Sequence, residues 1–107
     1  MSEPTSTSAV EVTDNPAADR YEARVDGALA GFAQYVRSGD LIAFVHTEVQ
    51  PQYEGRGVGA ALARTSLDAA RAEGTPVLAA CPFYAGWIER HPEYQDLLVP
   101  EEGDSAG

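Results

Sequence analysis

The sequence contains no lysine and a single cysteine, Cys81, among its 107 residues. One cysteine cannot form an intrachain disulfide, which indicates a reducing compartment, and we expect the cytoplasm. No apolar run approaches the roughly 20 residues that a membrane-spanning helix needs. Residues 1–9 also lack the basic start and apolar stretch of a signal peptide. We therefore expect neither a membrane-bound nor a secreted protein.

Basic residues are scarce as well. Seven arginines stand against 17 aspartates and glutamates, which gives a formal net charge of −10. General nucleic-acid binding and docking on anionic membranes both need a basic surface, so we expect neither kind of partner. The charge suits a basic partner such as an amine. Two histidines and one cysteine are too few for a closed zinc site, and no metal is expected.

The composition predicts one folded domain between two tails. Residues 1–9 are rich in Ser, Thr and Pro without periodicity, and residues 100–107 combine acids with glycines. Both tails are predicted to be disordered. Residues 10–99 carry the hydrophobic periodicity, and their length suits a single core. A monomer and a homodimer are both compatible with this organisation.

The first half of the domain is typical of an antiparallel meander. Alternation of apolar and polar residues predicts strands at 10–13, 21–25, 28–36 and 41–49. Asp26-Gly27 is a strong hairpin-turn signal between the second and third of these strands. Strict alternation along the last strand predicts that one face carries Ile42, Phe44, His46 and Glu48. The other face would then carry Leu41, Ala43, Val45, Thr47 and Val49.

The second half changes to helical periodicity. A helix is predicted over 58–73 and ends at Gly74, with a buried stripe formed by Val58, Ala61, Leu62, Thr65, Ala69 and Ala72. A short strand at 76–80 and a short helix at 83–90 follow. A right-handed crossover through the first helix makes its two flanking strands parallel. The predicted class is α+β, a mixed sheet of the α/β/α type with a short C-terminal helix.

A glycine cluster, Glu54-Gly55-Arg56-Gly57-Val58-Gly59, lies between a strand and a helix. Glycine lets backbone N–H groups turn outward, and the helix adds its positive N-terminal end. The loop therefore suits a phosphate or pyrophosphate, although a plain turn before a helix has the same pattern. A P-loop is excluded because no Gly-Lys-Ser/Thr follows. A Rossmann fold does not suit so short a chain with an antiparallel first half.

The loop and its flanks resemble the acetyl-CoA signature of the GNAT acyltransferase superfamily, Gln/Arg-x-x-Gly-x-Gly/Ala between a strand and a helix. The runs that carry the resemblance are 44–51 and 53–62. Two further segments, 80–84 and 90–94, are similar to those of the very small stand-alone members of this superfamily. The resemblance covers residues 21–98. Glu54 stands where Gln or Arg is usual, and Arg56 is expected to supply the positive charge.

The resemblance implies a minimal GNAT fold that uses acetyl-CoA as co-substrate and transfers acetyl to a small-molecule or protein amine. It implies that the pantetheine arm runs beside the backbone of Thr47, Glu48 and Val49. It also implies that the pyrophosphate is held by loop amides of Gly55, Arg56, Gly57, Val58, Gly59 and Ala60. The N-terminal helices that usually build the acceptor pocket are missing. A CoA-binding module without turnover and an interaction domain with a plain glycine turn are the alternatives.

Three side chains near the carboxyl ends of the parallel strands are candidates for the chemistry. His46 is a candidate base, with Glu48 as its orienting partner or as the base itself, but both residues also suit a solvated strand. Cys81 is either a nucleophile or a small buried hydrophobe. Tyr84 is either an acid for the leaving thiolate or a core residue. We expect His46 and Cys81 to line one acetyl site, with direct attack favoured over an acetyl-Cys81 intermediate.

Overall fold

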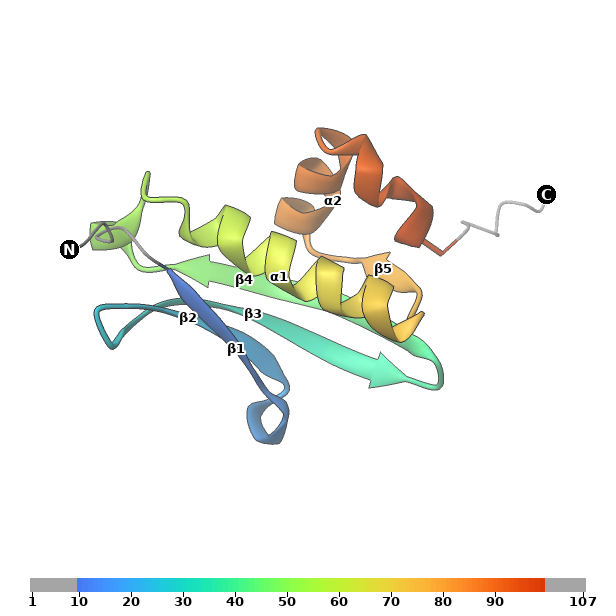
Figure 1. Ribbon diagram of the computed structural model, residues 1–107, viewed down its shortest axis with the longest axis horizontal. Helices are drawn as coiled ribbons and strands as arrows, with labels where there is room; N and C mark the ends of the chain where they lie inside the picture. The colour runs from blue at the N-terminus through green and yellow to red at the C-terminus, as the bar shows by residue number, and fades with distance from the viewer. Residues whose placement is uncertain (1–9, 100–107) are drawn as a thin grey trace.

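The computed structural model describes residues 10–99, which form a five-stranded sheet in the order β1-β2-β3-β4-β5 (Figure 1). The strands are β1 (Glu11–Asn15), β2 (Arg20–Val25), β3 (Ala28–Ser38), β4 (Leu41–Val49) and β5 (Val77–Ala79). The first four pair antiparallel, and β4 pairs with β5 in parallel. The predicted meander and crossover are therefore confirmed. The two predicted tails, 1–9 and 100–107, lie outside the described residues.

Two α-helices lie on the same side of this sheet, as Figure 1 shows. Helix α1 (Val58–Glu73) contacts each of the first four strands, and α2 (Pro82–Glu89) packs near β4 and β5. Short 3-10 turns complete the chain at η2 (Pro16–Ala18), η3 (Pro51–Tyr53) and η4 (Pro92–Leu97). The α+β class is confirmed. Within residues 10–99 the helices form one layer, so one face of the sheet has no helix on it.

The buried face of α1 differs from the predicted stripe, although its bounds and its Gly74 cap agree with the prediction. The buried positions are Val58, Leu62, Ala63, Ser66, Leu67 and Ala70. Thr65, which the stripe included, is exposed. Ser66 is tolerated inside because its hydroxyl donates to the Leu62 carbonyl oxygen at 2.7 Å and lies 2.8 Å from the Tyr84 hydroxyl. A count of apolar residues alone could not find a buried serine.

The core lies between the covered face of the sheet and the two helices. At its centre the ring of Phe44 stacks on that of Tyr84, with centroids 4.3 Å apart and planes 3° from parallel. Tyr35 on the neighbouring strand β3 and Tyr21 on β2 beyond it pack against Phe44. Cross-strand aromatic packing of this kind fixes which face of each strand is buried.

A β-bulge at Val45 interrupts the alternation of β4. Phe44 pairs with Tyr35 and His46 pairs with Gln34, so Val45 has no partner of its own. Phe44 lies in the core. Thr47 again faces the helices, because its hydroxyl contacts the sulfur of Cys81, the residue that precedes α2. Val45 and His46 between them both point away from the helices. The predicted strict alternation is wrong here, because the bulge adds one residue to the strand.

Candidate functional site

Strands β4 and β5 separate soon after they meet. Their pairing covers Ile42, Ala43 and Phe44, and the last bond in this direction is donated by the Cys81 N–H to the Phe44 carbonyl oxygen at 2.8 Å. Beyond this point β4 continues to Val49 without a strand on that side among residues 10–99. The sheet therefore opens at the carboxyl ends of its two parallel strands, where ligands bind in such sheets.

The open edge of β4 offers its own backbone groups to a ligand. The Gln50 N–H donates to the Ala30 carbonyl oxygen at 2.8 Å, which directs Gln50 toward β3. Backbone groups alternate along a strand, so Glu48 also faces β3 while Thr47 and Val49 direct their N–H and C=O groups to the open edge. Of the three residues expected beside the pantetheine arm, these two present backbone groups there, and Glu48 does not.

The glycine loop leads from this edge to α1. Two of its glycines have left-handed backbone conformations, with φ of +83° at Gly55 and +81° at Gly57. Within this turn, the Arg56 N–H donates to the Tyr53 carbonyl oxygen, and the Ala61 N–H donates to the Gly57 carbonyl oxygen. In the part of the chain that the structure describes, no backbone carbonyl accepts the N–H groups of Gly55, Gly57, Val58, Gly59 and Ala60. The positive end of the α1 dipole adds to this set of donors.

The loop glycines serve different purposes. A side chain at Gly57 would meet no protein atom within 4 Å, and only its positive φ requires glycine. A Cβ at Gly59 would lie 2.9 Å from the Phe83 ring, so this glycine lets the start of α2 pack against the start of α1. Sequence reasoning assigned both to the phosphate and missed the contact with Phe83. The open space around Gly57 is what the approach of a phosphate requires.

Arg56 and Glu54 are both exposed in the loop. The Arg56 guanidinium carbon lies 5.7 Å from the centroid of the Tyr53 ring. This contact keeps the cation beside the glycine loop, where the sequence expectation required a positive charge. Glu54 has no ion-pair partner among the described residues.

The structure does not bring the side chains of His46 and Cys81 together. Cys81 is buried, and its sulfur lies 3.4 Å from the Thr47 hydroxyl on the helix side of the sheet. His46 lies on the opposite face, where its Nε2 is 3.1 Å from Oε2 of Glu48 and its ring is 6.0 Å from that of Phe32. The bulge at Val45 causes this separation. The two side chains therefore do not contact each other, and a shared acetyl site for them stays a prediction.

Tyr84 is placed as a core residue. Its side chain is fully buried, and its hydroxyl contacts Ser66 at 2.8 Å and donates to the Leu62 carbonyl oxygen at 3.4 Å. Burial raises the pKa of Tyr84 above that of a free tyrosine. A phenol that holds its proton this strongly and points into α1 is poorly suited to protonate a thiolate at the open edge.

Residues 10–99 contain no cluster of three or more His, Cys, Asp or Glu side chains that could hold a metal ion. Neither α1 nor α2, nor any other described helix, is long and apolar enough to cross a membrane.

Comparison with known proteins agrees with the fold. An NMR structure of a GCN5-like protein from Staphylococcus aureus superposes with a TM-score of 0.64 at 21% identity, over 89% of this chain and 91% of that one. The crystal structure of nourseothricin acetyltransferase gives 0.51 at 23% identity, over 79% of this chain and 66% of that one. No curated protein matches the chain. Residues 20–97 match the GCN5-related N-acetyl-transferase family, so the chain belongs to this family.

Proposed function

We propose that the protein transfers the acetyl group of acetyl-CoA to an amine, with CoA bound along the open edge of β4 and the glycine loop. One observation carries the proposal. Unpaired backbone groups lie at two successive places along the chain, first at Thr47 and Val49 on the open edge and then at the five free N–H groups between Gly55 and Ala60, with the internally bonded turn η3 between them. A thioester cofactor with a peptide-like arm and a pyrophosphate needs donors in this order.

The residues divide the binding task between two segments. The edge groups of Thr47 and Val49 pair with the amides of the pantetheine arm as they would with an added strand. The N–H groups of the glycine loop and the first turn of α1 hold the pyrophosphate, with Arg56 as the nearby cation. The thioester end then lies where β4 and β5 separate, beside Cys81 and Thr47.

Direct attack by the amine fits these positions better than transfer through cysteine. The amine nitrogen forms a bond to the carbonyl carbon, the carbon–sulfur bond breaks, and the amine gives up a proton. Glu48 and His46 are exposed, hydrogen-bonded to each other and available as the base. Cys81 lies beside Thr47 and has no neighbouring base, which a nucleophilic cysteine needs. The leaving thiolate takes its proton from the Cys81 thiol or from water.

A pair of glycines at the two ends of α1 tests the binding site. Gly57 and Gly74 both have a positive φ, of +81° and +71°, and both have open space around them. Alanine at either position should cost about 1–2 kcal/mol of stability through the same backbone strain. Only Gly57→Ala should weaken acetyl-CoA binding, by tenfold or more in calorimetric titration, because its methyl group meets the phosphates. Equal affinities of Gly57→Ala and Gly74→Ala would refute the loop assignment.

A CoA-binding module without turnover is the second candidate. The absence of a helix over one face of the sheet in residues 10–99 favours it, because no enclosed acceptor pocket is formed there. Release of free CoA thiol with a panel of primary amines distinguishes the two. Transfer requires release that depends on the amine. Tight acetyl-CoA binding without any release would identify the module.

A further inference from the structure

Gly31 on β3 is a glycine whose missing side chain leaves room for neighbouring segments. It is buried, and its φ lies outside the left-handed region in which five other glycines of the chain are found. A Cβ at Gly31 would lie 2.6 Å from the Glu48 carbonyl oxygen, 3.1 Å from Cγ1 of Val58 and 3.2 Å from Cα of Val49. Space, and not backbone conformation, therefore requires glycine at this position.

The atoms around Gly31 belong to the segments that carry the two groups of free donors, the edge groups of β4 and the N–H groups of the glycine loop. The Glu48 carbonyl and the Val49 N–H are parts of one planar peptide unit and point in opposite directions. The carbonyl therefore faces β3 while the N–H faces the open edge. Val58 begins α1, and its own N–H is one of the free N–H groups of the loop. Gly31 thus adjoins one donor of each group from inside the protein.

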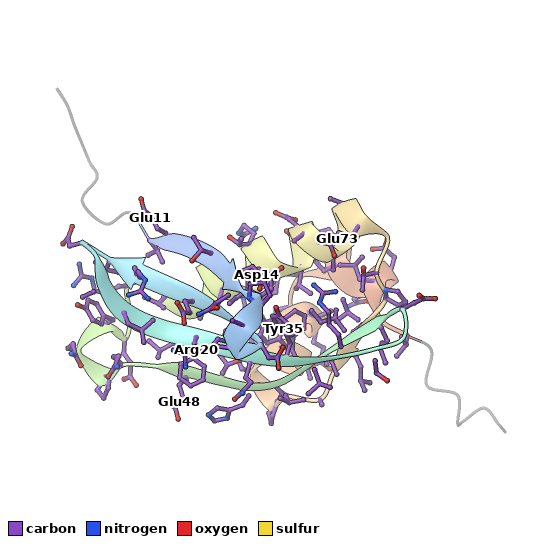
Figure 2. All side chains as sticks on the ribbon, turned by 90° about the horizontal axis from the view of Figure 1, so that it is seen from below. Glu11, Asp14, Arg20, Tyr35, Glu48 and Glu73 are labelled. Carbon is purple, nitrogen blue, oxygen red and sulfur yellow. The ribbon has the colours of Figure 1, made fainter. Side chains whose placement is uncertain are left out.

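The neighbours of Gly31 cannot move aside without moving these donors. Glu48 pairs with Phe32 in the ladder between β3 and β4, and Val58 is 1% exposed in the core. Ordinary contacts of a Cβ begin at 3.4 Å, so a methyl group at Gly31 would displace the Glu48 oxygen from 2.6 to 3.4 Å, by about 0.8 Å. Figure 2 shows the Glu48 side chain pointing outward from the sheet, so the collision involves its backbone alone.

The first turn of α1 is confined on a second side as well. Gly59 follows Val58, and a Cβ at Gly59 would lie 2.9 Å from the Phe83 ring of α2. The start of the helix therefore has little free space toward α2. Because a densely packed interior transmits displacements, a collision at Gly31 changes the position of the loop donors relative to the edge of β4.

We propose that Gly31 is a positioning residue for CoA, because its lack of a side chain sets the distance between the edge groups of β4 and the donors of the glycine loop. The inference rests on the proposed function, in which one ligand spans both groups. It assigns a role to a residue of β3 that lies outside both groups. A ligand that spans them needs their spacing to match its own length, whereas a ligand held by one group does not.

A comparison of a whole and a partial ligand tests this role. Acetyl-CoA spans both groups, and ADP carries the pyrophosphate without the pantetheine arm. Gly31→Ala should weaken acetyl-CoA binding at least tenfold in calorimetric titration. The affinity for ADP, followed by the amide NMR signals of residues 55–60, should stay within twofold because the loop keeps its own conformation. A loss of stability alone would leave the ratio of the two affinities unchanged, since the folded fraction scales both equally.

Gly39→Ala is the matched control. Gly39 lies in the turn at the other end of the same strand pair, with a φ of +60° and open space where a side chain would lie. Alanine there strains the backbone and should leave the ratio of the two affinities at the wild-type value. An unchanged acetyl-CoA affinity in Gly31→Ala, or an equal loss for both ligands, would overturn the proposal.

Val58→Ala serves as the second variant if Gly31→Ala does not fold. It removes Cγ1 and lets the start of α1 settle toward β3, so it changes the same spacing in the opposite direction. It should weaken acetyl-CoA at least threefold more than ADP, and equal losses would overturn the proposal. Failure of the wild type to bind acetyl-CoA would refute the proposed function itself. A wild type that binds it, with no selective loss in these variants, would refute only the role of Gly31.

Discussion

The two faces of the sheet carry similar residues in different surroundings. The covered face packs against α1 and α2, and the bare face has no helix on it among residues 10–99. On the covered face, Phe44 is fully buried and stacks on Tyr84 beneath α1. On the bare face, Phe32 is partly exposed and has Arg20 and His46 as its neighbours. The covered face thus stabilises the domain, and the bare face leaves aromatic, basic and acidic groups at the surface. The bulge at Val45 shifts the alternation of β4 by one residue. Even-numbered residues face the helices before it, and odd-numbered residues face them after it.

The largest expected difference in unfolding free energy is between two single variants, Phe44→Ala and Phe32→Ala. Phe44→Ala removes a fully buried ring and should cost about 3–5 kcal/mol of unfolding free energy, because the stacked Tyr84 is left facing a cavity. Phe32→Ala should cost about 1 kcal/mol, since its ring is partly solvated. Urea denaturation measures both. Similar losses for the two variants would contradict the division of roles between the faces.

A smaller effect is expected at Glu22, which among residues 10–99 is the one buried acid. Hydrogen bonds from Arg20, and then from Asn15, hold the pKa of Glu22 below its usual range. At pH 7 the variant Glu22→Gln should lose about 1–3 kcal/mol, because two arginines keep only a neutral partner. Glu48→Gln, at an exposed acid of the same face, should change stability by less than about 0.5 kcal/mol.

The stability difference between the wild type and Glu22→Gln should depend on pH in one direction. Because the pKa of Glu22 is lower in the folded state, its stabilisation is present above the unfolded value of about 4.3 and is lost as the pH falls through the folded value. The difference between the wild type and Glu22→Gln should therefore shrink below about pH 4. A difference that grew on acidification would show that Glu22 is not held in its charged form.

The sequence was sufficient for the elements that depend on local signals. Helix α1 has the predicted bounds because Gly57 and Gly74 frame it and its periodicity is helical throughout. The parallel pairing of β4 and β5 followed from the connection between them. The bulge at Val45 could not be predicted, because no glycine or proline marks it and it depends on the register with β3. This one residue places the side chain of His46 on the face opposite Cys81, which strict alternation along β4 could not show.

The smallest expected effect concerns Tyr84, which the sequence offered as either an acid or a core residue. Tyr84→Phe keeps the stacked ring and removes only the hydroxyl, while Ser66 still bonds to the carbonyl oxygens of Leu62 and Ala63. Stability should fall by about 1 kcal/mol or less. CoA release with amine should stay within twofold of the wild type, whereas loss of a general acid lowers rates by about 10²–10⁴. A loss of that size without a change in acetyl-CoA affinity would show that Tyr84 acts as a general acid. The bound thioester would then have to reach the Tyr84 hydroxyl inside the core.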